Sequence, residues 1–275
     1  MTTFCSAIMR PVHALVVGIV CAVALTAAGN IAEDKPAVPD FSGRWKLPGA
    51  AFDFAAPPPG MGAGPLVNTS GNRLVPIANH DSPLLKPWAA AAVKKHGDTL
   101  LAGRLAPDAH TSCLPEGVPY ILQLRGTVQF LQTPDWVMII YMNNNHRRLV
   151  HLNARHTANP KPSWFGESIG HYEGDTLVVD TIGIAVNEVS AIDRFGTPHT
   201  DAMRVVERYR IAADRKSIRV VFTVDDPGTF NMPWHASAGY TVGDEGTEED
   251  ICAENIRQIG LTGLITVPMA TKADF

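Results

Sequence analysis

Short runs in which apolar and polar residues alternate fill the chain from about residue 126 onward. These runs are rich in Val, Ile, Phe and Tyr and are separated by turn residues, which is typical of antiparallel strands joined by hairpins. We expect strands at 127–132, 136–142, 147–153, 168–173, 175–184, 203–211, 217–225 and 236–242. A further run at 41–47 adds a ninth strand, which is enough to close a barrel and hide the sheet edges.

The N-terminal part of the chain has a different pattern. Residues 36–81 are rich in Pro, Gly, Ala and Asn, so neither a helix nor a strand ladder can continue through them. The Ala-rich stretch 84–96 follows, with Gly97 where a helix-ending glycine belongs. The sequence thus predicts a mainly β fold, in which an antiparallel meander over 126–275 closes a barrel. An irregular arm over 29–125 carries the first strand and one main α-helix and belongs to the same structural domain.

An apolar run over 12–28 follows a start with one basic residue and ends in small residues. This pattern predicts that residues 1–28 are a secretory signal peptide, cleaved before Gly29, because the run is short for a membrane span. An uncleaved membrane anchor is the alternative. We expect a periplasmic or secreted protein with no membrane association after cleavage.

Cleavage before Gly29 leaves Cys113 and Cys252 as the cysteines of the mature chain. An even number of cysteines in an oxidising compartment favours a disulfide. Neither cysteine lies in a known catalytic signature, so a nucleophilic role is the weaker interpretation. We expect one disulfide between Cys113 and Cys252.

Composition and motifs exclude several classes of function. The 45% of hydrophobic and 18% of charged residues exclude intrinsic disorder, and the net charge of −4 gives no basic surface for nucleic acid or anionic lipid. The sequence has no P-loop, dinucleotide-binding glycine motif or serine-hydrolase elbow, so no cofactor is expected. His146, His151 and His156 are five residues apart, which matches no zinc signature, so no metal is expected either.

Strand parity places two carboxylates on apolar faces. Glu207 shares the odd-numbered face of 203–211 with Tyr209, and Asp226 shares the even-numbered face of 218–226 with Phe222. A turn near 214–215 brings these two faces together as one hairpin. We therefore expect Glu207 inside the barrel.

The loops beside this hairpin carry further candidates. His199 precedes one strand and Trp234 and His235 follow the other, so all three are expected at the same end of the sheet. We predict a mouth in which Glu207, His199 and Asp226 are catalytic and Trp234, His235, Tyr209 and Phe222 bind the substrate. The alternative is an internal ion pair of the carboxylates with an Arg, which has no catalytic role.

A second polar group lies in the segment 163–181. With a two-residue turn at 173–174, Glu167 falls opposite Asp180, on one face with His171. Facing carboxylates repel, so one could hold a proton for acid–base chemistry or for contact with a substrate. The alternative, that this face is the outside of the barrel, is equally supported.

The sequence has two resemblances to known families. The segment 163–181, together with 196–199, 206–209, 225–227 and 252–255, resembles an abundant family of exported bacterial proteins of unknown function. Gly43-Arg44-Trp45 resembles the G-x-W pattern that opens the first strand of lipocalin-like, calycin-type barrels. That resemblance implies two classes: carriers of apolar ligands, and cofactor-free hydratases, cyclases or isomerases with acidic side chains in the barrel.

The sequence therefore predicts an exported β-barrel that binds a small apolar or aromatic molecule. We expect a cofactor-independent acid–base enzyme of the isomerase, cyclase or lyase type. A non-catalytic periplasmic carrier of a hydrophobic ligand is the alternative, and a Glu207 fully paired with Arg would favour it.

Overall fold

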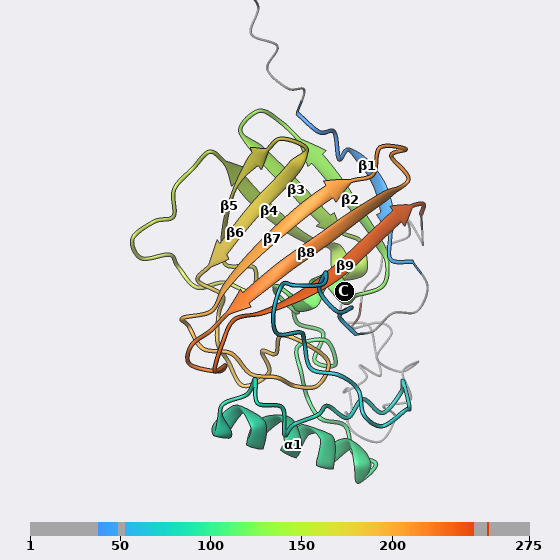
Figure 1. Cartoon of the computed structure of the whole chain (residues 1–275), viewed down its shortest axis with the longest axis vertical. Helices are drawn as coiled ribbons and strands as arrows, with labels where there is room; N and C mark the ends of the chain where they lie inside the picture. The colour runs from blue at the N-terminus through green and yellow to red at the C-terminus, as the bar shows by residue number, and fades with distance from the viewer. Residues whose placement is uncertain (1–37, 49–52, 245–251, 253–275) are drawn as a thin grey trace, which may run out of the picture. The chain divides into compact units, whose positions relative to one another are not determined.

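The computed structural model describes residues 38–48, 53–244 and Cys252. Nine strands in this part of the chain form one closed barrel, in which each strand pairs with the next and β1 pairs with β9 (Figure 1). The strands are β1 (Gly43–Lys46), β2 (Thr127–Gln132), β3 (Trp136–Tyr141), β4 (His146–Leu152), β5 (Glu167–Glu173), β6 (Thr176–Ile182), β7 (Arg204–Ile211), β8 (Ser217–Asp225) and β9 (Trp234–Val242). The predicted mainly β barrel is confirmed.

Strand pairing departs from a pure meander at one place. β4 and β5 are parallel, with Val150 opposite Ser168, whereas the other neighbours are antiparallel. A parallel pair requires the chain to return to the end at which the first strand began. The connection 153–166 makes this return, and it is too long and too poor in alternating residues for its path to be predicted from the sequence.

The expected strand positions are otherwise confirmed, with ends that shift by at most two residues. The hairpin of β7 and β8 has the predicted register, with Glu207 opposite Phe222 and Val205 opposite Val224. The β5–β6 hairpin does not. Ile169, rather than Glu167, lies opposite Asp180, because Gly174 and Asp175 form the turn and Gly174 adopts a φ of +58°.

The α-helix in the described part of the chain, α1 (Pro87–Leu101), begins and ends later than the predicted 84–96. Pro87 occupies its first turn, where the missing N–H removes no hydrogen bond. Gly97 does not end the helix. It is buried inside α1, where the lack of a side chain lets the helix approach Ile77 closely, and the chain turns instead at Gly103, which has a φ of +68°.

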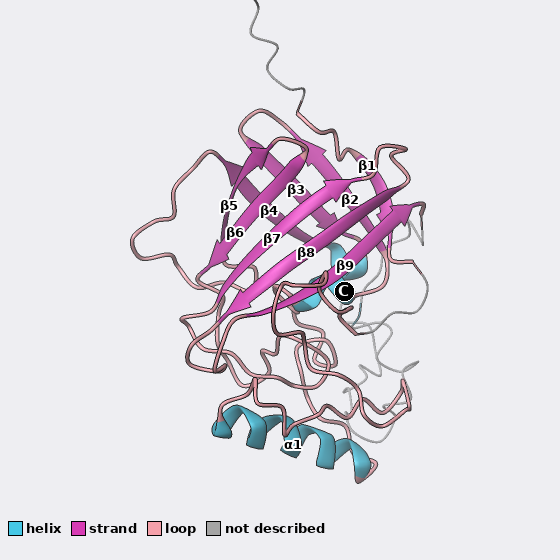
Figure 2. Cartoon of the chain, in the orientation of Figure 1, coloured by secondary structure: helices cyan, strands magenta, loops and turns pink. Residues whose placement is uncertain are grey.

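Loops lie between α1 and the strands (Figure 2). Residues 53–86 contain no helix and no strand, only isolated bridges such as Leu85 with Phe230. The indole Nε1 of Trp88 donates to the Gly228 carbonyl over 2.8 Å. These contacts attach the start of α1 to the connection between β8 and β9.

The disulfide between Cys113 and Cys252 is confirmed, with Cα atoms 5.4 Å apart. The predicted signal peptide and its cleavage point lie outside the described residues. Within the described ranges, no helix is long and apolar enough to cross a membrane.

Candidate functional site

The barrel interior holds a buried ion pair. Glu207 on β7 is fully buried, and both of its carboxylate oxygens accept hydrogen bonds from the Arg148 guanidinium on β4, over 2.9 and 2.5 Å. Tyr209 donates its hydroxyl to the same carboxylate over 2.7 Å. Sequence parity placed Glu207 correctly inside the barrel, and its partner is an Arg, as the alternative interpretation required.

Arg148 is itself saturated with partners. Its Nε donates to the Ser168 hydroxyl over 2.9 Å, and one terminal nitrogen donates to the Thr181 hydroxyl over 2.5 Å. Burial lowers the pKa of Arg148, but attraction to Glu207 outweighs burial and raises it above its ordinary value. The guanidinium is therefore charged, and both oxygens of the Glu207 carboxylate are engaged in hydrogen bonds with it.

Asp226 has a similar structural role at the end of the barrel. It is fully buried and accepts hydrogen bonds from the backbone and hydroxyl of Thr200, over 2.7 and 2.6 Å, and from Gly228 and Thr229. It joins the loop before β7 to the loop after β8. His199 lies beside it, as predicted, and burial lowers the pKa of this histidine.

The aromatic residues predicted to bind substrate are packed into the core. Trp234 is buried, with its ring centroid 6.0 Å from that of Phe222 and 5.9 Å from that of Phe230. His235 points to the other face of β9, where its Nδ1 lies 2.8 Å from the Thr223 hydroxyl. Glu207, Tyr209 and Phe222 thus share the interior, whereas His199 and Asp226 are at the loop end.

Glu167, His171 and Asp180 lie on the outside of the barrel, because Ser168, Leu177 and Thr181 are among the buried positions of the β5–β6 hairpin. Asp180 forms a double hydrogen bond with Arg204, and His171 is exposed beside Glu173. Glu167 accepts from Thr157 and contacts His156, and these hydrogen bonds lower its pKa. Glu167, His171 and Asp180 therefore lie apart from the interior residues.

A cavity of about 530 Å³ lies outside the barrel, beside α1, and we refer to it as the α1 cavity. Much of its wall is apolar, and its lining residues come from 73–76, 96–111 and 120–125, together with Asn143 and Arg194. The apolar lining residues include Leu74, Pro76, Leu100, Leu105, Ala106 and Leu124. A volume and lining of this kind are typical of sites for small organic molecules.

The α1 cavity is also lined by Arg73, His110, Arg125 and Arg194. Two further ionisable side chains line both this cavity and a smaller hollow between α1 and residues 188–196. They are His96, one helical turn before Leu100, and Asp108, which is 6% exposed. Burial lowers the pKa of His96, and the nearby Asp108 carboxylate and the Arg194 backbone offset this only in part. His96 is therefore neutral at pH 7.

Two further polar groups come from the short 3-10 helix η1 (Tyr120–Gln123). Residues three apart are aligned in such a helix, so Tyr120 and Gln123 reach the same cavity. Burial, followed by the charge of Asp108, raises the pKa of Tyr120 well above its ordinary value, so its hydroxyl stays protonated. The Gln123 side-chain oxygen is buried with no hydrogen-bond partner among the described residues.

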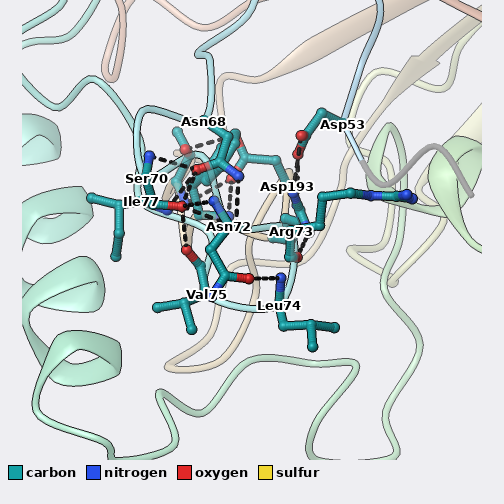
Figure 3. A network of polar contacts seen from close by, with 12 residues as sticks. Asp53, Asn68, Ser70, Asn72, Arg73, Leu74, Val75, Ile77 and Asp193 are labelled. Carbon is teal, nitrogen blue, oxygen red and sulfur yellow. Dashed lines mark hydrogen bonds and ion pairs between the residues drawn. The ribbon is translucent and has the colours of Figure 1, made fainter.

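The loop 68–78 forms another wall and is held by its own polar side chains (Figure 3). The Asn68 side-chain oxygen accepts from the backbone N–H groups of Ser70 and Ile77, and the Asn68 amide donates to the Asn72 carbonyl. Arg194 joins this loop to the chain before it, because it bonds both Asp53 and the Arg73 carbonyl. The wall is thus fixed by contacts within the loop and by Arg194 rather than by regular secondary structure.

Sequence reasoning missed the α1 cavity. Helical spacing places His96 and Leu100 on one face, but no pattern indicates that residues 105–125 pack against it. Across the described ranges, no group of three His, Cys, Asp or Glu side chains is arranged to hold a metal ion. A scan against protein-family models and a search among curated proteins both give no match to this chain.

Proposed function

We propose that this protein is an exported binding protein for a small, mainly apolar molecule, and that its ligand site is the α1 cavity. Export is supported by the apolar run at 12–28 and by the disulfide, which is typical of oxidising compartments. We further propose that the barrel is of the lipocalin-like type and that the irregular N-terminal arm supports the cavity. The resemblance of Gly43-Arg44-Trp45 to G-x-W favours the first of these.

The observation that carries the proposal is the largely apolar α1 cavity, which is lined in part by Gln123, whose buried side-chain oxygen has no hydrogen-bond partner among the described residues. A buried acceptor without a donor is costly, by about 1–3 kcal/mol, unless a ligand or water supplies the hydrogen bond. A ligand with an apolar ring system and one hydroxyl group satisfies both the walls and this acceptor. The saturated Arg148–Glu207 pair, by contrast, disfavours chemistry on a ligand inside the barrel.

The experiment measures binding of β-naphthol, which is intrinsically fluorescent, and of naphthalene, which lacks the hydroxyl. We expect a Kd for β-naphthol of about 100 µM or tighter, and binding of naphthalene roughly tenfold weaker for want of one hydrogen bond. Gln123→Leu should remove this difference between the two compounds.

A matched pair of helix variants locates the site. Leu100 lines the cavity, and the next residue, Leu101, is 67% exposed. Leu100→Trp should fill the cavity and weaken β-naphthol binding at least tenfold, whereas Leu101→Trp should leave it unchanged. Equal effects of the two variants, or no saturable binding by the wild-type protein, would contradict the proposed function.

A further inference from the structure

We propose that the α1 cavity is also a catalytic site, in which His96 removes a proton from the carbon next to a ketone carbonyl and Tyr120 holds the carbonyl oxygen. This inference rests on the proposed function, because the ketone must first bind in the cavity. It assigns the acid–base chemistry to residues outside the barrel.

The orientation of His96 is fixed by the turn that contains Gly196. Gly196 has a φ of +68°, and a Cβ atom at that position would lie 2.3 Å from Nδ1 of His96. The ring therefore packs directly on the glycine backbone with Nδ1 toward it. A hydrogen bond to the Arg194 backbone holds the ring from the same turn. In the proposed mechanism Nδ1 keeps the proton, and Nε2 carries the lone pair that a general base needs.

Asp108 supplies the charge that such a base requires. Its Oδ1 accepts from the backbone and hydroxyl of Thr111, over 2.7 and 2.8 Å, so the carboxylate is held in place. Asp108 is close enough to affect the pKa of both His96 and Tyr120, so its charge stabilises the imidazolium that forms when His96 takes a proton.

Tyr120 completes the arrangement as a neutral donor. Its side chain is buried and lines the cavity, on the same face of η1 as Gln123. A phenol that stays protonated can donate to the oxygen of a carbonyl and bind it more strongly as negative charge develops there.

The proposed step balances without a cofactor or an oxidant. The C–H bond next to the carbonyl breaks, and its proton goes to Nε2 of His96. The electron pair forms a carbon–carbon double bond, and the carbonyl oxygen becomes an enolate oxygen held by the Tyr120 hydroxyl. The imidazolium then returns the proton to the same carbon or to a conjugated one. The substrate class is an enolisable, mainly apolar ketone. Return of the proton to a conjugated carbon isomerises an unsaturated ketone, and return to the same carbon exchanges its hydrogen with solvent.

The experiment uses β-tetralone in D2O with the disulfide-intact protein. Saturation-transfer NMR reports binding of the ketone, and the loss of its α-proton signals reports exchange in the same sample. We expect exchange at least about 100-fold faster than in buffer, the lower end of the usual contribution of a general base. His96→Gln should abolish this acceleration while the ketone still binds, and Tyr120→Phe should reduce it with the fold retained.

His151→Gln is the control, because His151 is an exposed residue on β4, away from the cavity. If His96→Gln unfolds, His96→Asn and the exchange rate of Tyr120→Phe carry the same test. Binding of β-tetralone without accelerated exchange, or acceleration that persists without His96, would overturn the catalytic inference and leave the binding function intact. Absence of β-tetralone binding would overturn the catalytic inference alone when β-naphthol still binds, and absence of binding by both compounds would overturn the binding function as well.

Discussion

Replacement of Glu207 by Gln tests whether the barrel interior is structural. The amide keeps the shape of the carboxylate but offers one acceptor oxygen in place of two and turns an NH2 group toward the Arg148 guanidinium. Arg148 is 1% exposed, so its charge cannot regain water without opening the barrel. The variant therefore keeps a buried positive charge with no counterion.

Loss of one partner from a buried ion pair costs about 3–5 kcal/mol. For a domain of this size, that corresponds to a fall in melting temperature on the order of 10 °C. The double variant Arg148→Met with Glu207→Leu removes both charges together, and we expect it to lie within about 2 kcal/mol of the wild type.

Urea unfolding followed by tryptophan fluorescence and circular dichroism measures these free energies. Glu173→Gln is the surface control, because Glu173 is exposed and paired with Arg208, and it should leave the urea midpoint nearly unchanged. A loss below about 1 kcal/mol for Glu207→Gln would refute the structural role, as would a double variant that is no more stable than the single one.

Three other measurements test the described contacts. Cys113 and Cys252 are 139 residues apart, so reduction of their disulfide should lower the unfolding free energy by about 4–5 kcal/mol in the chain-entropy model. Equal urea midpoints with and without reductant would contradict this stabilisation. Burial lowers the pKa of His96 and His199, so below pH 6.5 the unfolded chain binds more protons than the folded chain. The stability that the two histidines contribute is therefore present above pH 6.5 and is lost as the pH falls. An NMR titration that finds either pKa at or above 6.5 would contradict this pH dependence. Gly196→Ala should cost at least about 1–2 kcal/mol from its left-handed backbone alone and displace His96, which a shifted imidazole NMR signal would report.

The strands could be predicted because their periodicity is local. Each inward residue of β7 and β8 is set by alternation within its own run, so parity places Glu207 correctly. The same alternation in β4 puts Arg148 on one face with Val150 and Leu152, which is a local signal for its burial. The parallel pairing of β4 with β5 depends on the path of a long loop and has no such local signature.

The α1 cavity could not be predicted for the same physical reason. Its walls combine α1 with η1 and the loop 68–78, and their packing depends on tertiary contacts rather than on periodicity. Gly97 shows how tertiary packing can override a local pattern. Gly97 fits a helix end on local grounds, yet close packing on Ile77 places it inside the helix.

A crystal structure of the protein with β-naphthol would show whether the ligand site lies beside α1 or inside the barrel. We expect electron density for the rings between Leu100 and Leu105, with the hydroxyl oxygen about 3 Å from the Gln123 side-chain oxygen. Density for the ligand beside Glu207 in the barrel, with the α1 cavity empty of it, would refute a ligand site beside α1.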